Sequence, residues 1–126
     1  MTPSFGSSHR PETITVKKAE KLLVVGFDDG VVVELPAELL RVESPSAEVQ
    51  GHSPSERKLV AGRRHVGIIA VEPVGNYAVK IVFDDLHDSG LYTWDFLYDL
   101  GRRRDKVWAE YLAALDAAGQ SRDPRR

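Results

Sequence analysis

The sequence predicts an α+β domain, built as a mainly antiparallel sheet of two hairpins with short helices and a C-terminal amphipathic helix. Two pairs of β-branched runs are each joined by turn residues, which is the pattern of hairpins. Apolar residues near the C-terminus recur at helical spacing. The sequence lacks the alternating strands and helices of a doubly wound sheet, and it lacks a glycine loop that could cradle phosphate.

The first half of the chain carries one hairpin and one helix. Residues 13–17 alternate polar and apolar side chains, as a half-buried strand does. KLLVVGF and VVVEL flank Asp28-Asp29-Gly30, where glycine supplies the positive φ of a tight turn. Pro36, at a first helical position, begins a short helix that should end before Ser44.

The second half begins irregularly. Residues 43–65 show little periodicity, so we expect mainly an exposed excursion. HVGIIAVE and YAVKIVF, joined by residues 73–76, predict a second hairpin, and TWDFLYDLG predicts a helix ending at Gly101. Asp105 would cap a last helix. Its apolar face comprises Val107, Trp108, Tyr111, Leu112 and Leu115.

Length and composition predict one soluble domain with two tails. The 126 residues are 42% hydrophobic and 29% charged, which is ordinary for a chain that buries a core. Residues 1–11 are predicted to be a flexible tail, residues 12–118 the domain, and residues 119–126 a frayed tail. No run approaches the roughly 20 apolar residues of a membrane span and no signal peptide is recognisable, so we expect a cytoplasmic protein without a membrane partner.

Charge and cysteine content exclude several classes of protein. The net charge of −2 gives no field that would attract nucleic acid. Residues 102–126 carry seven Lys/Arg against four Asp/Glu, a local charge of +3, but we interpret Arg102-Arg103-Arg104 as a solvated link rather than a phosphate-binding surface. The chain has no cysteine, which excludes a disulfide framework, a thiolate metal site, a cysteine-held cluster and a cysteine nucleophile.

The stretch FDDLHDSGLYTWDFL, residues 83–97, holds the candidate chemistry. His87 could bind zinc or iron, with Asp84, Asp85 or Asp88 supplying oxygen ligands. A lone histidine beside a turn is more often structural, and adjacent acids at a strand end point in opposite directions, so we favour a solvated turn. Ser89 as a nucleophile would need convergent geometry that sequence proximity does not supply.

The aromatic residues of this stretch have two interpretations. Tyr92 and Trp94 share one face of a continuing strand, and Trp94 lies three residues before Leu97 on the helix that follows. We expect Trp94 in the core. The alternative is that Trp94 lies open in a ligand groove beside His87.

Three segments resemble the gamma-butyrobetaine hydroxylase-like N-terminal domain family: LPAELLRVESPSAEV, VEPVGNYAVKIVFDDLHDSGLYTWDFLYDLG and the opening L.V.F.DG. The resemblance covers roughly residues 12–101. It implies a domain that, in the carnitine-pathway hydroxylases, precedes an iron- and 2-oxoglutarate-dependent oxygenase domain and holds zinc through three cysteines and one histidine. The cysteine positions are here Ser44, Ser46 and Val49, and His87 falls at the histidine position. We therefore expect no zinc at this constellation.

The resemblance also implies association with P-loop iron–sulfur carrier proteins of the Mrp type. Because the chain lacks the P-loop, the cysteines and the oxygenase domain, it should not be a hydroxylase. We predict a non-catalytic accessory or interaction domain whose partner is an oxygenase, an iron–sulfur carrier or its own copy. Exposed aromatics beside Asp85-Leu86-His87 would support this prediction. The alternative is a domain that binds iron, zinc or a small ligand through His87 and nearby carboxylates. The candidate surface comprises Asp84, Asp85, His87, Asp88 and Tyr92.

Overall fold

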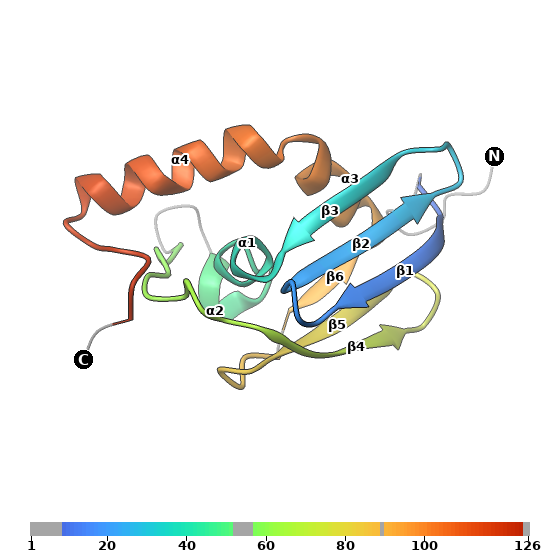
Figure 1. Cartoon of the computed structure of the whole chain (residues 1–126), viewed down its shortest axis with the longest axis horizontal. Helices are drawn as coiled ribbons and strands as arrows, with labels where there is room; N and C mark the ends of the chain where they lie inside the picture. The colour runs from blue at the N-terminus through green and yellow to red at the C-terminus, as the bar shows by residue number, and fades with distance from the viewer. Residues whose placement is uncertain (1–8, 52–56, 89, 125–126) are drawn as a thin grey trace.

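The computed structural model describes residues 9–51, 57–88 and 90–124 (Figure 1). The described strands form two antiparallel three-stranded sheets, in the orders β1-β2-β3 and β4-β5-β6. The α+β class and the antiparallel pairing predicted from the sequence are confirmed. Within these ranges, no helix is long and apolar enough to cross a membrane.

The first sheet consists of β1 (Pro11–Lys17), β2 (Leu22–Phe27) and β3 (Val32–Pro36). Gly30 has a φ of +88° in the turn between β2 and β3, and the Asp29 carboxylate accepts a 2.9 Å hydrogen bond from the Val31 N–H. These observations confirm the predicted turn at Asp-Gly. Glycine suits this position because it adopts a positive φ without strain.

The second sheet consists of β4 (Ile68–Val74), β5 (Ala78–Phe83) and β6 (Leu91–Thr93). Val74 pairs with Ala78 across the turn that contains Gly75, whose φ is +54°. The second predicted hairpin is therefore confirmed, but its loop is shorter than predicted, because Pro73 and Val74 belong to β4.

One hydrophobic core joins the two sheets, which overlap in Figure 1. Leu23 and Val25 of β2 belong to the same buried cluster as Ile81 and Phe83 of β5. Leu97 of the third helix is also fully buried in this cluster. The apolar faces of both hairpins are thus removed from water together.

The first two helices flank the segment that contains Ser44 and Ser46. Helix α1 (Ala37–Val42) follows β3, and Pro36 is the residue before its first position rather than the first helical residue. Helix α2 (Ala47–Gln50) lies inside the segment that we expected to be an exposed excursion. That expectation is wrong for Ser44, Ser46 and Val49, which are all buried.

Helix α3 (Trp94–Arg102) begins after Thr93, whose hydroxyl accepts a 3.2 Å hydrogen bond from the Phe96 N–H. The prediction that this helix ends at Gly101 is wrong. A Cβ at Gly101 would lie 2.3 Å from a methyl group of Val33. Glycine therefore allows α3 to approach β3 closely.

Helix α4 (Arg104–Ala117) begins one residue before Asp105, so Asp105 lies in its first turn rather than at the cap. Its buried residues are Val107, Tyr111 and Leu115. Leu112, expected on the same face, is 39% exposed. The predicted C-terminal helix is present, but it is only weakly amphipathic and buries a narrow stripe of residues.

The N-terminal tail is shorter than expected. Residues 1–8 lie outside the described part, but β1 already begins at Pro11. The His9 N–H donates to the Asp95 carboxylate at 3.1 Å, and the His9 ring stacks on Tyr98 with centroids 3.6 Å apart. These contacts correct the assignment of residues 9–11 to a flexible tail.

The C-terminal segment is also attached to the domain. The carbonyl groups of Ser121 and Arg122 accept hydrogen bonds from the N–H groups of Gly62 and Arg64, at 2.9 and 3.0 Å. The Arg122 guanidinium donates to both oxygens of the buried Glu38 carboxylate, at 2.7 and 2.9 Å. The expectation of a frayed tail is therefore wrong up to residue 124, the last one described.

Candidate functional site

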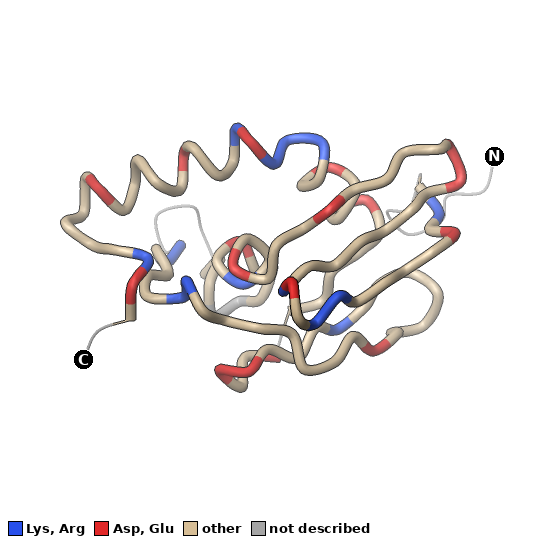
Figure 2. The backbone as a smooth tube through the Cα atoms, in the orientation of Figure 1, with Lys and Arg blue, Asp and Glu red and all other residues tan. Residues whose placement is uncertain are grey.

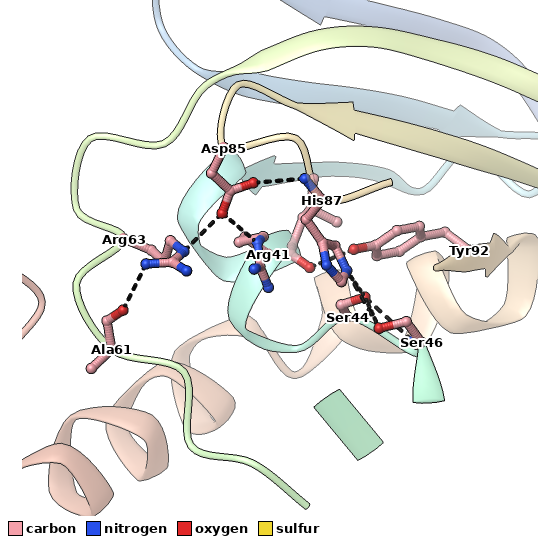
Figure 3. A network of polar contacts seen from close by, with 9 residues as sticks. Arg41, Ser44, Ser46, Ala61, Arg63, Asp85, His87 and Tyr92 are labelled. Carbon is pink, nitrogen blue, oxygen red and sulfur yellow. Dashed lines mark hydrogen bonds and ion pairs between the residues drawn. The ribbon is translucent and has the colours of Figure 1, made fainter. Parts of the chain in front are cut away.

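Two serines and a histidine converge at the positions where the resemblance places zinc ligands. Ser44 lies between α1 and α2, Ser46 lies just before α2, and His87 lies in the loop after β5 (Figure 3). The Nε2 of His87 is 3.0 Å from the Ser44 hydroxyl and 3.3 Å from the Ser46 hydroxyl, and the two hydroxyls are 3.2 Å apart. The fold thus brings three buried polar side chains into one cluster.

This cluster does not have the chemistry of a structural zinc site. Serine hydroxyls stay neutral where cysteines supply thiolates, and Val49, at the remaining position, is a buried apolar residue. Among the residues that the structure describes, no three His, Cys, Asp or Glu side chains are grouped to hold a metal. The geometry favours a network of hydrogen bonds, and the absence of zinc stays a prediction.

Asp85 connects two arginines to the loop that carries His87. Its Oδ2 lies 2.7 Å from Arg41 Nε and 2.8 Å from Arg63 Nε, while its Oδ1 accepts a 3.1 Å hydrogen bond from the His87 N–H. Burial raises the pKa of Asp85, but the His87 N–H and the two guanidinium groups more than offset this and hold the pKa below its ordinary value of 3.8. Asp85 is therefore an ionised carboxylate with a structural position, not a general base with a raised pKa.

Leu86, between Asp85 and His87, is an exposed apolar residue of this loop. Its side chain is 81% exposed and its φ is +71°, in the left-handed region that leucine rarely adopts. The loop is held by hydrogen bonds from the Leu86 N–H to the Phe83 carbonyl at 3.0 Å and from the Phe83 N–H to the His87 carbonyl at 3.1 Å. A fixed backbone therefore presents an apolar side chain to solvent.

The other two acids of the predicted site have different surroundings. Asp84 and Asp88 are exposed, whereas His87 is buried. The Asp84 N–H donates to the Gly67 carbonyl at 3.0 Å, which attaches the loop to the start of β4. The two carboxylates thus belong to the solvent side of the loop that presents Leu86.

Tyr92 and Trp94 are core residues. Tyr92 is fully buried, so the prediction that it contributes to a binding surface is wrong. Its hydroxyl donates to the Leu40 carbonyl at 2.6 Å, and burial raises the pKa of Tyr92 well above its ordinary value. Trp94 is 7% exposed and its indole N–H donates to the Asn76 carbonyl at 2.9 Å, which confirms the core assignment and excludes the open groove.

The cationic residues near His87 were not predicted from the sequence. Arg41 is a buried residue of α1, and Lys58 and Arg63 come from the segment after α2. Arg41 could have been noticed as a charged residue within the apolar run LLRV, because arginine is almost never buried without a partner. Lys58 and Arg63 carry no such signal in an irregular segment.

The arginine run 102–104 lies where α3 meets α4 (Figure 2). Arg102 lies over the Tyr98 ring, 5.8 Å from its centroid, and Arg103 pairs with Asp99 at 2.9 Å. Arg104 donates to the Glu34 carbonyl at 2.8 Å. These contacts support the interpretation of this run as a solvated link.

Comparisons with known proteins agree with the residue pattern. Residues 14–98 match the family model described as gamma-butyrobetaine hydroxylase-like, N-terminal. Two solution structures determined by NMR are similar: one at 51% identity over 95% of this chain and 94% of the other (TM-score 0.82), and one at 47% identity over 100% and 93% (TM-score 0.81). A search of curated proteins found no match.

A crystal structure from Acidithiobacillus ferrooxidans is also similar, at 35% identity over 73% of this chain and 92% of the other, with a TM-score of 0.62. It is described as a protein with unknown function that belongs to the DUF971 family. The family model covers the two hairpins, α1, α2 and the start of α3, and therefore the whole His87 cluster. The chain belongs to the gamma-butyrobetaine hydroxylase-like N-terminal family.

Proposed function

We propose that this domain is a non-catalytic accessory module that binds a protein partner through Leu86. The observation that carries the proposal is the combination of 81% exposure with a φ of +71° at a leucine. A left-handed conformation costs a residue with a Cβ about 1–2 kcal/mol, and an exposed side chain recovers none of this by burial within the domain. Burial against a partner would recover it.

The surroundings of Leu86 favour a partner with a particular surface. Asp84 and Asp88 flank the leucine and are exposed, while Asp85 is already occupied by two arginines. An apolar pocket with Lys or Arg at its rim would accept the leucine and pair with the two free acids. The partner classes that the resemblance implies are an oxygenase, an iron–sulfur carrier and a second copy of this chain, and we place the interaction in the cytoplasm.

The titratable groups Asp85, His87 and Tyr92 are already hydrogen-bonded or ion-paired within the protein, which supports a non-catalytic role. Asp85 is paired with Arg41 and Arg63, His87 contacts Ser44 and Ser46, and the Tyr92 hydroxyl is bound to a carbonyl. Groups that are buried and mutually hydrogen-bonded stabilise a loop. They are poorly placed to exchange protons with a substrate.

Affinity capture from a native lysate tests the proposal with two matched variants. Leu86→Asn removes the apolar side chain and introduces a residue that tolerates positive φ. Leu112→Asn removes an exposed leucine of α4, 39% exposed, as the control. The parent and Leu112→Asn should retain the same partner and Leu86→Asn should lose it. Retention of that partner by Leu86→Asn would contradict the proposal.

A second candidate function is binding of a metal or small ligand at His87. The convergence of His87, Ser44 and Ser46 within 3.3 Å favours it. Metal analysis of the purified protein and thermal shifts with iron(II) and zinc(II) separate the two candidates, since a bound ligand raises the melting temperature. A stabilisation by either metal that disappears in His87→Ala would favour this second function.

A further inference from the structure

A basic cleft lies beside His87. It has a volume of about 460 Å³ and is lined in part by Arg41, Lys58, Arg63 and His87. The cations come from α1 and from the segment that follows α2, so the fold gathers them from separate parts of the sequence. The apolar lining consists of Val49, Leu59, Val60 and Ala61.

The charges around this cleft do not balance. Arg41, Lys58 and Arg63 contribute three positive charges, and Asp85 contributes one negative charge, which leaves +2 among the charged groups that line or pair across it. The nearby Glu43 carboxylate pairs with Arg57 instead, at 2.8 Å. The side chains of Arg41 and Arg63 are 9% and 34% exposed, so their mutual repulsion is only partly screened by solvent, and an anion in the cleft would stabilise the domain.

Arg41 also has an unused donor. Its side chain is 9% exposed, and within the described part of the chain its Nε alone is paired, with Asp85. Its Nη1 is buried without a hydrogen-bond partner. Arg63 Nε lies 2.8 Å from the same Asp85 oxygen but is not aligned for a hydrogen bond, so it too is incompletely satisfied. A buried donor left without an acceptor is destabilising, and an oxyanion supplies acceptors.

We propose that this cleft binds a small dianionic oxyanion of the phosphate class. A phosphate monoester carries a charge of about −1.5 to −2 at pH 7, which matches the surplus, and its oxygens suit the planar guanidinium of Arg41 together with the point charge of Lys58. This site differs from the proposed protein contact. The cleft is lined by Arg41, Lys58 and Arg63, whereas the protein contact is made by the exposed Leu86. The outcome of one test therefore does not determine the other.

Isothermal titration calorimetry at low ionic strength tests the site with inorganic phosphate and with glycerol 3-phosphate. We expect saturable binding of inorganic phosphate with a dissociation constant of about 1 mM or tighter. Comparable affinity for both probes assigns the site to the phosphate group alone, and tighter binding of glycerol 3-phosphate assigns it to an organic phosphate. Either result supports the proposal, and no saturable binding of either probe overturns it.

Variants of the lysines distinguish the cleft from general charge screening. Lys58→Gln should weaken phosphate binding about tenfold, because one charge-assisted contact is lost. Lys106→Gln, on the exposed side of α4, and Leu86→Asn should bind phosphate as the parent does. Lys58 is exposed, so its variant should fold even if Arg41→Gln does not. Equal weakening in Lys58→Gln and Lys106→Gln would overturn the proposal.

Discussion

At the scale of single residues, Asp85 holds together groups that are distant in the sequence. Arg41 comes from α1, Arg63 from the segment before β4, and the His87 N–H from the same loop as Asp85 (Figure 3). The Asp85 side chain is 23% exposed, so these interactions are only partly screened by solvent. Its removal would leave the guanidinium of Arg41 buried without its acceptor.

Asp85→Asn should lower the free energy of unfolding at pH 7 by about 1.5–3 kcal/mol, the range for hydrogen bonds to charged groups. The pKa of Asp85 is depressed in the folded state, so its stabilisation is present above the ordinary value of 3.8 and is lost as pH falls below it. Urea unfolding at pH 7 and at successively lower pH should show the parent and variant converging in acid. A constant difference through this range would contradict the assigned role.

Cysteines at positions 44, 46 and 49 would test whether the fold retains the geometry of a zinc site. If the fold retains the geometry of a ligand set, the triple variant Ser44→Cys, Ser46→Cys, Val49→Cys should bind one zinc ion together with His87. The parent should bind none, because its hydroxyls and valine supply no thiolate. Elemental analysis of tag-free protein decides both points, with the triple variant carrying His87→Ala as the control. Stoichiometric zinc in the parent would contradict the prediction.

The burial of some residues of this site could be predicted from the sequence, and that of others could not. Trp94 could be assigned from helical spacing, because a large apolar side chain near Leu97 is best buried. Tyr92 could not be distinguished from a surface residue, because its burial depends on the Leu40 carbonyl that accepts its hydroxyl. The convergence of Ser44, Ser46 and His87 depended on the family resemblance, since 43 residues separate Ser44 from His87.

At the scale of elements, the hairpins were predictable and the loops between them were not. The turn at Gly30 follows from local chemistry, and the continuous apolar run of β2 is typical of a buried strand. The burial of Ser44 and the attachment of residues 119–124 depend on contacts with other parts of the chain. Local patterns contain no signal for such contacts, so an irregular segment was mistaken for an exposed one.

Helix α3 provides a test of core packing. Trp94→Ala should lower the free energy of unfolding by about 3–5 kcal/mol, because a nearly buried indole leaves a cavity and the Asn76 carbonyl loses its donor. His87→Ala should cost less, about 1–3 kcal/mol, because the Ser44 and Ser46 hydroxyls can still bond to each other. Urea unfolding of both variants measures the order. A Trp94→Ala protein as stable as the parent would refute the core assignment.

Gly101 provides a separate test of the contact between α3 and β3. Alanine has the higher helix propensity, so Gly101→Ala would stabilise an isolated helix. Here the added Cβ would lie 2.3 Å from Val33, and we expect destabilisation by about 1–3 kcal/mol from overpacking. Val33→Ala should restore part of the loss when combined with Gly101→Ala. Thermal unfolding of the single and double variants would show whether the close approach, rather than helix propensity, determines the residue.

At the scale of the whole molecule, one core supports two surfaces of different character. The loop after β5 presents Leu86 between the exposed Asp84 and Asp88. The cleft is lined by Arg41, Lys58 and Arg63. In Figure 2 the acidic loop lies at the bottom of the view and the arginine link between α3 and α4 at the top. The small net charge of the chain, −2, thus conceals local surpluses of both signs. Specific partners can recognise such surpluses.

The affinity of the purified partner for three forms of this domain tests the central proposal most directly. The proposal predicts that Leu86→Asn binds at least about 30-fold more weakly than the parent, since loss of a hot-spot side chain costs 2 kcal/mol or more. Leu112→Asn should bind as the parent does. Urea unfolding should show that Leu86→Asn is at least as stable as the parent, because asparagine relieves the strain at positive φ. Equal affinity of Leu86→Asn and the parent would contradict the account.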